Sequence, residues 1–334
     1  MPEMRNVQKA QSQQERKRAG FVAIVGRPNA GKSTLLNRFV GQKVAIVTSK
    51  PQTTRNRIQG IVNRPEGQIV IIDTPGLHEA DSVLNKQMMR EVAAAMEGID
   101  VLLLMADAST MLPHSDSLLL EKAKRFGGKA ILALNKVDKL PKAKLLPLIN
   151  AFAKEHEFAA IVPISALKGH GCEELLREVL KNLPEGQPYF PEDQVTDQPE
   201  RFLAAEIVRE KAIRQTYHEV PHALAVVVDK WEESPKLLRI EMTLNVERDS
   251  QKKILIGRKG EMLKKIGTEA RKELEELFVA KIFLGLFVKV VPHWRENPKA
   301  VRALDWHAQL EALSESQAQS QGVKEDAGRE PDPE

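Results

Sequence analysis

The chain is poor in cysteine, with Cys172 as the single one among 334 residues. A lone cysteine excludes a disulfide framework and any multi-cysteine zinc or iron–sulfur site, and it is typical of a reducing compartment such as the cytoplasm. Long apolar stretches are lacking as well. The longest, residues 282–291, is interrupted by Lys289, so we expect no transmembrane segment. The N-terminus has no apolar signal region.

Charge of one sign is also lacking, because 50 basic and 46 acidic residues leave a net charge of only +4. Any affinity for nucleic acid must therefore come from basic residues that cluster locally. The hydrophobic fraction of 42% is high enough to form a core, which excludes wholesale disorder. The length predicts about two domains.

Both ends of the chain read as tails. Residues 1–19 have few large apolar side chains and a net charge of +3, and we expect a disordered basic tail. Residues 296–334 are expected to form a C-terminal extension, disordered and acidic from about residue 315. Residues 184–200 contain four prolines and read as a linker or a wrapped connection.

Residues 20–183 predict an α/β domain with a mostly parallel sheet. Unbroken apolar runs at 21–25, 69–72, 101–105, 130–134 and 160–164 are typical of strands that are buried on both faces. Amphipathic stretches between them, such as 84–97, 117–126 and 173–183, read as helices. The alternation of strands and helices indicates an open sheet covered on both sides.

A phosphate-binding loop follows the first of these strands and opens a helix. It has the pattern G-x-x-x-x-G-K-[ST] and consists of Gly26, Arg27, Pro28, Asn29, Ala30, Gly31, Lys32 and Ser33, with Thr34 next. The glycines let several backbone N–H groups point at phosphate oxygens, and the helix N-terminus adds partial positive charge. Lys32 reaches the β- and γ-phosphates, and the Ser33 hydroxyl can bind Mg²⁺.

Three further motifs follow in a fixed order, each at the end of a predicted buried strand. The first is Asp73, Thr74, Pro75 and Gly76, where the carboxylate can hold Mg²⁺ and the Gly76 N–H can meet a γ-phosphate. The second contains Asn135, Lys136 and Asp138, and Asp138 can accept two hydrogen bonds from guanine that adenine cannot offer. The third, Ser165, Ala166 and Leu167, can meet guanine O6 with a backbone N–H.

This set of motifs resembles the Ras-like GTPases, and more closely the Era family of the TrmE–Era–septin group, over roughly residues 20–295. The resemblance implies a mobile first switch at residues 42–57, in which Thr54 or Thr53 closes on Mg²⁺ when GTP is bound. Lys32, Thr54 and Gly76 are then the expected catalytic residues. Ser33, Thr54 and Asp73 are the expected Mg²⁺ ligands, and Asn29 matches the position that holds K⁺ in potassium-activated members.

The water-positioning glutamine of many Ras-like enzymes is missing. Its place after Gly76 is taken by Leu77, followed by His78. Leucine cannot hold water, so we expect slow intrinsic hydrolysis that is limited by poor water positioning and by missing positive charge.

Residues 201–295 predict a small α+β domain in the order helix–strand–strand–helix–turn–helix–strand. The turn has the pattern G-x-x-G, and residues 251–272 around it carry eight bases and two acids. This arrangement looks like a type II KH domain, which grips about four unpaired nucleotides. The expected RNA-binding residues are Lys252, Lys253, Ile256, Gly257, Arg258, Lys259, Gly260, Lys264 and Lys265.

The resemblance implies a GTP-dependent switch that binds small-subunit rRNA near its 3′ end during assembly of the small ribosomal subunit. It also implies a cytoplasmic protein with peripheral association at the inner membrane, and we expect a monomer. Two alternatives remain at this point: a GTPase partner in tRNA modification, and a P-loop kinase or ATPase, which the guanine-reading Asp138 opposes.

Overall fold

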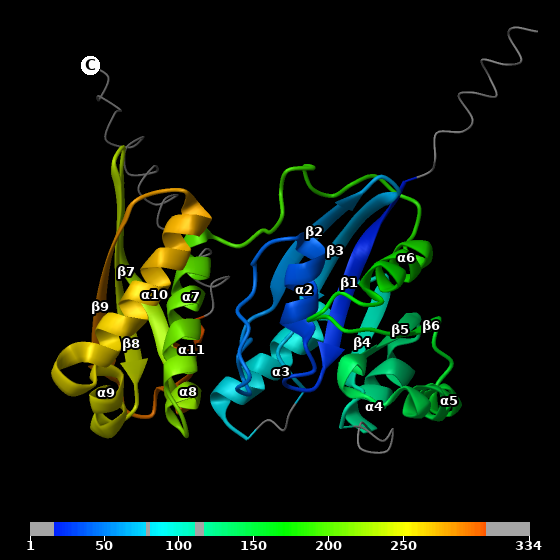
Figure 1. The fold of residues 1–334 in the computed structure, drawn as a ribbon, viewed down its shortest axis with the longest axis horizontal. Helices are drawn as coiled ribbons and strands as arrows, with labels where there is room; N and C mark the ends of the chain where they lie inside the picture. Colours follow the sequence, from blue (N-terminus) through cyan, green and yellow to red (C-terminus); the bar gives the residue numbers. More distant parts are fainter. Residues whose placement is uncertain (1–16, 78–80, 111–116, 305–334) are drawn as a thin grey trace, which may run out of the picture. The chain divides into compact units, whose positions relative to one another are not determined.

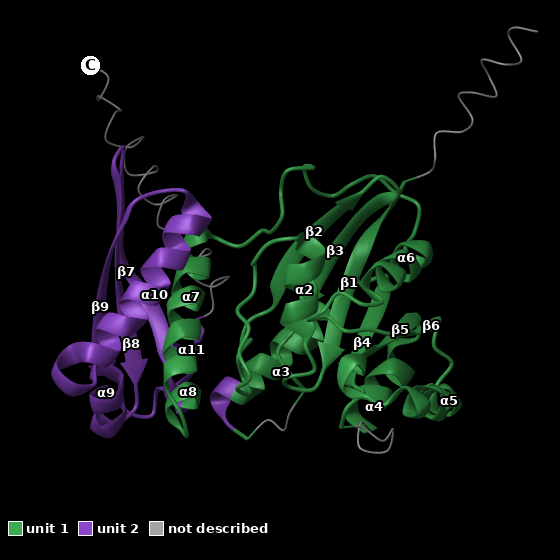
Figure 2. Ribbon diagram, in the orientation of Figure 1, with its two compact units in different colours: residues 1–81, 85–222 green, residues 82–84, 223–334 purple. Residues whose placement is uncertain are grey.

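The computed structural model describes residues 17–77, 81–110 and 117–304 (Figure 1). The chain forms two compact units, residues 1–81 with 85–222 and residues 82–84 with 223–334 (Figure 2). Each unit has its own sheet, as the sequence predicts for a GTPase-type domain followed by a smaller α+β domain.

The first unit is built on a six-stranded sheet in the order β2-β3-β1-β4-β5-β6. All neighbouring pairs are parallel except β2 and β3, which are antiparallel. The strands are β1 (Arg18–Gly26), β2 (Ile58–Arg64), β3 (Gly67–Asp73), β4 (Val101–Asp107), β5 (Lys129–Asn135) and β6 (Ala160–Pro163). The expected mostly parallel sheet is thereby confirmed.

Helices cover both faces of this sheet (Figure 1). They are α2 (Lys32–Val40), α3 (Val83–Ala95), α4 (Ser117–Phe126), α5 (Leu145–Glu155) and α6 (Cys172–Asn182). Alternate residues of β1 divide between two cores: Val22 and Ile24 pack with α2 and α6, while Ala23 and Val25 pack with α3, α4 and α5. Burial on both sides explains why the central strands are unbroken apolar runs.

Two elements of this unit were not among the predicted ones. β2 was missed because Gln59 and Asn63 interrupt its apolar residues, which leaves no long apolar run in this antiparallel edge strand. α5 was missed although its buried Leu148 and Phe152 have helical spacing. Its Pro147 lies in the first turn, where a helix needs no backbone donor.

The proline-rich segment after α6 runs alongside the sheet edge. The buried Gln68 side chain accepts backbone N–H bonds from Tyr189 and Phe190 at 2.8 and 3.0 Å, and the Asn63 amide donates to Glu192 O at 2.9 Å. The segment then enters α7 (Glu200–Gln215), which belongs to the first unit.

The second unit has a three-stranded sheet in the order β7-β8-β9. β7 (Ala225–Ser234) and β8 (Leu237–Val246) are antiparallel, and β9 (Ile282–Val290) is parallel to β8. Between β8 and β9 come α9 (Asp249–Ile256), a short turn and α10 (Glu261–Phe278), and the short helix α11 (Pro298–Arg302) follows β9. The short helix α8 (Val220–Ala223) spans the boundary between the two units. The predicted order of elements is confirmed along the chain, with α8 as an additional short helix, although its first helix, α7, belongs to the first unit.

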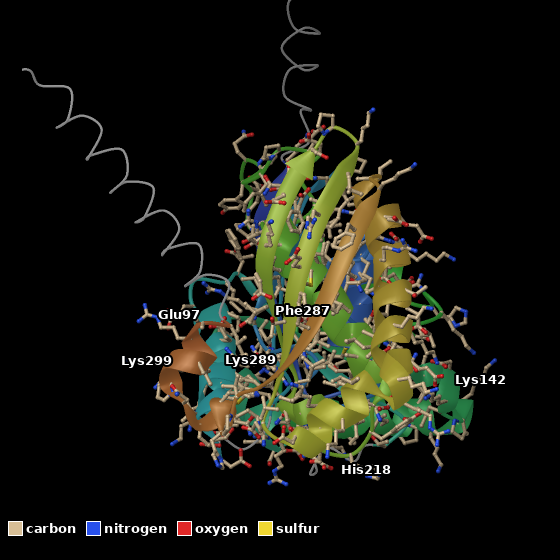
Figure 3. All side chains as sticks on the ribbon, turned by 90° about the vertical axis from the view of Figure 1, so that its left-hand side faces the viewer. Glu97, Lys142, His218, Phe287, Lys289 and Lys299 are labelled. Carbon is tan, nitrogen blue, oxygen red and sulfur yellow. The ribbon has the colours of Figure 1, made fainter. Side chains whose placement is uncertain are left out.

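α10 covers one face of this sheet and turns Ile266, Ala270 and Leu274 into the core. Alternation along β9 leaves Phe287 and Lys289 exposed on the other face, where both are labelled in Figure 3. Trp294, which follows β9, is buried and donates its indole N–H to Ala223 O at 2.8 Å. It is therefore a packing residue of this unit.

Candidate functional site

The phosphate-binding loop joins β1 to α2 in a tight conformation that requires glycine at two positions. Gly31 has a φ of +104°, and a side chain at Gly26 would lie 2.4 Å from the carbonyl oxygen of Met105. Lys32 is 6% exposed, and its ammonium donates to the carbonyls of Gly26 and Arg27 at 3.1 Å each. The loop is thus closed around a lysine that has no carboxylate or phosphate within hydrogen-bond distance among the described residues.

A small cluster of hard oxygen atoms lies beside this lysine. The Ser33 hydroxyl donates to Asp73 Oδ2 at 2.6 Å and lies 2.9 Å from the Thr54 hydroxyl. Asp73 is fully buried, and its Oδ1 has no hydrogen-bond partner within the described chain. Two hydroxyls and a carboxylate with a free oxygen suit Mg²⁺, which prefers oxygen ligands.

Burial shifts the two charged groups of this cluster in opposite directions. It raises the pKa of Asp73 to about 6, although the nearby Lys32 charge works against that shift. It lowers the pKa of Lys32 to about 8, against the attraction of Asp73. Both pKa values leave the groups mostly charged at neutral pH, but burial makes each charge less favourable, and a bound phosphate and cation would offset that cost.

The two candidate threonines of the switch differ in their contacts. Thr54 is buried and lies beside Ser33, whereas the Thr53 hydroxyl lies 2.6 Å from the Thr48 hydroxyl and donates to Lys50 O at 2.8 Å. Thr53 therefore closes the switch loop on itself, and Thr54 is the one that the structure brings to the oxygen cluster.

The motif of residues 73–76 packs tightly under the phosphate loop. A side chain on Gly76 would lie 2.6 Å from the backbone nitrogen of Pro28, so only glycine permits this approach. Thr74 donates to Ile24 O at 2.8 Å, and the Leu77 N–H donates to Gly26 O at 3.0 Å. The Leu77 side chain is 6% exposed and belongs to the core on the α3 side. His78 lies outside the described residues.

Asn135 connects the phosphate loop to the last motif. Its amide donates to Ala30 O at 2.7 Å, and its Oδ1 accepts the Ala166 N–H at 2.9 Å. Asn135 is 2% exposed, so it fixes both loops and offers little surface to a ligand.

Lys136 and Asp138 both line the pocket beside Ser165, Ala166 and Leu167. The Lys136 ammonium pairs with Asp107 at 2.5 Å. Burial alone would raise the pKa of Asp107, but hydrogen bonds from Lys136 and Ser109 hold it below its ordinary value. A hydrogen bond from the Ser165 hydroxyl lowers the pKa of Asp138, so its carboxylate is charged and ready to accept hydrogen bonds at neutral pH.

One pocket of about 510 Å³ unites these groups, a size that suits a nucleotide-sized ligand. The predicted residues that line it are Pro28, Asn29, Gly31, Lys32, Ser33, Thr34, Thr54, Gly76, Asn135, Lys136, Asp138, Ser165, Ala166 and Leu167. Gly26, Arg27, Ala30, Asp73, Thr74 and Pro75 adjoin this lining rather than forming it. Thr53, the alternative Mg²⁺ ligand, also lines it, and residues 46–50, 52 and 139, which the sequence did not single out as ligands, complete it.

These switch residues are held from α7, a contact that sequence reasoning missed. Arg209 donates to Thr53 O and is 3% exposed. Glu210 accepts the Val47 N–H at 2.9 Å, and Arg214 donates to Val47 O at 3.0 Å. The only sequence signal was a run of charged residues inside an apolar helix, and we had placed that helix in the second domain.

The predicted RNA-binding turn in the second unit connects α9 to α10. Gly257, Lys259 and Gly260 all have positive φ, of 72°, 50° and 83°, so the turn presents its backbone at the surface. Arg258 and Lys259 are exposed, and no atom lies within 4 Å of a Cβ built on Gly260. Among residues 223–304, no atom therefore obstructs the approach of a phosphate to this glycine.

A groove of about 620 Å³ begins at this turn and runs between α10 and β9. Of the predicted RNA-binding residues, Gly260 and Lys264 line it, whereas Lys252, Lys253, Ile256, Gly257, Arg258, Lys259 and Lys265 do not. Its other lining residues are Leu237, Leu263, Gly267, Thr268, Arg271, Ile282, Phe283, Leu284 and Leu286. The β9 wall was missed because we followed charge, whereas these residues are mostly apolar.

Within the described ranges, no helix is long and apolar enough to cross a lipid bilayer.

Two family models match the chain. The model described as 50S ribosome-binding GTPase matches residues 21–136, and the model described as KH domain matches residues 219–295. GTPase Era from Syntrophus aciditrophicus is 49% identical over 292 residues, which cover 87% of this chain and 95% of that relative. GTPase Era from Pseudomonas putida (strain W619) is 46% identical over 291 residues, covering 86% and 97%.

Two solved structures are similar over nearly the same extent. One is Era in complex with MgGDPNP and nucleotides 1506–1542 of 16S ribosomal RNA, with 45% identity and a TM-score of 0.82, covering 86% of this chain and 98% of that one. The other is a single-residue variant of Aquifex aeolicus Era bound to GDP·AlF4⁻, with the same identity, TM-score and coverage.

Proposed function

The chain belongs to the Era family of GTPases, and on that premise we propose that it is a slow GTP-dependent switch for assembly of the small ribosomal subunit. As a member of this family it is a GTP hydrolase. In the proposed role it binds small-subunit rRNA near the 3′ end through its KH domain. One observation carries the proposal: a single chain holds a pocket lined by four nucleotide-binding motifs and a basic turn that opens into a groove.

The nucleotide is held from both ends of the pocket. Loop N–H groups and Lys32 bind the phosphates, and Asp138 accepts the N1–H and N2–H₂ of guanine. Ser33, Thr54 and Asp73 are the residues that would hold Mg²⁺, which when bound neutralises charge on the β- and γ-phosphates. The 2.9 Å contact between Ser33 and Thr54 supports Thr54 over Thr53 in this role.

Slow hydrolysis follows from the place of Leu77. Its side chain lies in the core and has no polar atom, so it cannot orient an attacking water. Hydrolysis also develops negative charge on the phosphates, which a second positive charge beside Lys32 would stabilise.

K⁺ is the proposed source of that second charge. Asn29 lines the pocket, and its amide nitrogen donates to Ser49 O at 2.9 Å. This bond leaves Asn29 Oδ1 as an acceptor next to the phosphates, where a monovalent cation can bind. K⁺ held there would stabilise the transition state as an arginine finger does.

The switch segment is proposed to link nucleotide state to RNA binding. α7 holds residues 47 and 53 and is followed by α8 and β7, where the KH match begins. Movement of the switch on GTP binding would therefore pull on the helix that leads into the RNA-binding domain. Domain limits of 201–295 for this part and 184–200 for the linker remain our proposal.

RNA binding is proposed to combine the turn and the groove. The backbone of residues 257–260 meets the sugar-phosphate chain, while Lys264 and the apolar wall of β9 face the bases of about four unpaired nucleotides. The exposed lysines and arginines around the turn add attraction that falls steeply with salt.

The decisive experiment is sequencing of RNA crosslinked in cells to the intact protein and to two variants, Gly260→Asp and Gly260→Asn. Asparagine adopts positive φ readily and has the shape of aspartate without its charge, so it is the matched control. We expect small-subunit rRNA from near the 3′ end, lost in the aspartate variant and kept in the asparagine variant. Recovery of tRNA instead would overturn the assembly role and favour a partner in tRNA modification. GDP binding by both variants would show that the first unit is folded, and RNA binding by the asparagine variant would show the same for the second unit.

We also propose a cytoplasmic location with peripheral contact to the inner membrane, supported by the basic residues of segment 1–19. Residues 1–16 of that segment lie outside the described residues. Fractionation of cells making the full chain and a chain without residues 2–16 tests this point, since the shorter chain should leave the membrane fraction. An unchanged membrane fraction would exclude a role for the segment.

A further inference from the structure

The loop of the last motif, residues 165–169, uses nearly all of its backbone donors internally. The N–H groups of Ser165, Lys168 and Gly169 donate to acceptors in or next to the loop, and that of Ala166 donates to Asn135 Oδ1. The Leu167 N–H is left without a partner in the described chain. It is therefore the backbone donor of this loop that a ligand can use.

Arg38, near the end of α2, holds the peptide that carries this N–H. Its Nε donates to Ala166 O at 2.5 Å, and its Nη2 donates to Leu167 O at 2.7 Å. The loop accommodates the guanidinium through Gly169, where a side chain would come within 2.7 Å of Arg38 Nη1. Because both charge-assisted bonds come from one planar guanidinium, they fix the orientation of the peptide between Ala166 and Leu167 as well as its position.

Because the peptide is planar, the orientation of the Ala166 C=O also sets the orientation of the Leu167 N–H. The Ala166 C=O and the Leu167 N–H belong to one trans peptide and point in opposite directions. Because Arg38 draws the carbonyl to one side, the Leu167 N–H points to the other, and both Ala166 and Leu167 line the nucleotide pocket.

We propose that Arg38 is a positioning residue for guanine selection, which aims the Leu167 N–H at O6 of the base. Guanine offers an acceptor there, whereas adenine offers an amino group that would confront this N–H donor to donor. Arg38 then reads O6 indirectly, while Asp138 reads N1–H and N2–H₂. The proposal rests on the nucleotide site proposed above and adds a residue from outside the four motifs.

The test compares three diphosphates, GDP, 6-thio-GDP and IDP, on the intact protein and on Arg38→Met. 6-Thio-GDP keeps the N1–H and N2–H₂ donors but replaces O6 by a weakly accepting sulfur. IDP keeps O6 and lacks the amino group that Asp138 reads. We expect Arg38→Met to lower the affinity for GDP by about tenfold, which is the effect of losing one hydrogen bond. Binding of 6-thio-GDP should weaken much less, so that the preference for GDP over 6-thio-GDP shrinks while the preference for GDP over IDP is unchanged.

Two further variants separate positioning from folding. Arg38→Lys keeps the charge but not the fork of donors and should give an intermediate preference for GDP over 6-thio-GDP. Arg125→Met, an exposed arginine on α4, should match the parent with all three ligands. Equal weakening of the three ligands by Arg38→Met, or no weakening, would overturn the proposal. Failure of the parent protein to bind GDP at all would instead refute the nucleotide site itself.

Discussion

The carboxylate of Glu210 in α7 accepts the backbone N–H of Val47 in the switch segment at 2.9 Å. Glu210 is fully buried, and its other oxygen pairs with Lys43 at 2.5 Å. Arg214 donates both to Glu210 and to Val47 O, at 3.0 Å in each case. Because Glu210 is fully buried, its charge depends on such partners, and these contacts fix the switch segment firmly to the helix.

Replacing Glu210 by Gln should loosen this attachment. Glutamine keeps the shape and one acceptor but loses the pairing with Lys43 and Arg214, so we expect a loss of about 1–3 kcal/mol in the free energy of unfolding. Amide hydrogens of residues 43–50 should exchange faster, as measured by mass spectrometry. The exposed Glu121→Gln, which breaks a surface pair on α4, is the control and should change neither quantity. Unchanged exchange in the Gln variant would mean that Glu210 does not hold the switch.

The same substitution should uncouple the two ligands. In the intact protein we expect RNA affinity to differ by at least about fivefold between a non-hydrolysable GTP analogue and GDP, a typical size for coupling between sites. Glu210→Gln should reduce that ratio toward one while nucleotide affinity stays similar. Fluorescence anisotropy with a labelled single-stranded RNA measures the RNA affinity in each of the two nucleotide states. Equal RNA affinity in both nucleotide states of the intact protein would contradict the switch.

Stability of the nucleotide-free protein should depend on pH through Asp73. Its pKa of about 6 in the folded state lies above the value of 3.8 that we take for the unfolded chain, so the folded state binds the proton more tightly. This contribution to stability is full below pH 3.8 and is lost as pH rises through 6. Lowering pH from 7.5 to 5 should add roughly 1 kcal/mol from this group, and Lys32 hardly contributes in that range because its pKa is about 8.

Urea unfolding of the parent and of Asp73→Asn, without nucleotide or Mg²⁺, measures this effect. Asparagine cannot titrate, so the gain in the free energy of unfolding between pH 7.5 and pH 5 should be smaller in the variant by roughly 1 kcal/mol. Parallel pH profiles of the two proteins would show that Asp73 is charged well below pH 6 in the folded state.

Restoring the missing glutamine should not restore fast hydrolysis. Leu77 is 6% exposed and packs in the core, so Leu77→Gln buries an amide instead of presenting it to water. We expect a loss of about 2–3 kcal/mol in stability and no rise in kcat. Leu118→Gln, at a site that is 45% exposed, should be nearly neutral. A tenfold rise in kcat for Leu77→Gln would show that the side chain reaches the attacking water.

Turnover of GTP should depend on the monovalent cation. With Asn29 Oδ1 free to bind K⁺, we expect kcat in KCl to exceed that in NaCl by about tenfold, which corresponds to about 1.4 kcal/mol of transition-state stabilisation. Asn29→Gly removes the ligand and suits the φ of +60° at this position, so it should abolish the difference while leaving the fold intact. Equal rates in the two salts for the intact protein would rule out the K⁺ site.

Sequence reasoning reached the elements and motifs whose physical signal is local. Strands buried on both faces appear as unbroken apolar runs, and phosphate loops need glycine at fixed places, so β1, β4, β5 and the motif at Lys32 were all predictable. The structure shows what local signals omit. The apolar residues of β2 are interrupted by Gln59 and Asn63, and the β9 wall of the groove is apolar and carries no charge pattern.

The largest omission concerns contacts between distant segments. Nothing in the sequence around Glu210 indicates that its partner is Val47, 163 residues earlier, because a backbone N–H has no residue type. Arg38 is a similar case, since its acceptors are the carbonyls of Ala166 and Leu167. Side chains that act on distant backbone are thus the part of the site that composition and spacing cannot reveal.

Asn135 has a consequence for redesign of the nucleobase preference. Since its amide bridges Ala30 in one loop and Ala166 in the other, any substitution there disturbs phosphate grip and base recognition together. Asp138 has no comparable contact with the phosphate-binding loop among the described residues. A variant that accepts an unnatural purine should therefore be sought by changing Asp138. Asn135 should be kept, because it joins the phosphate-binding loop to the base-binding loop.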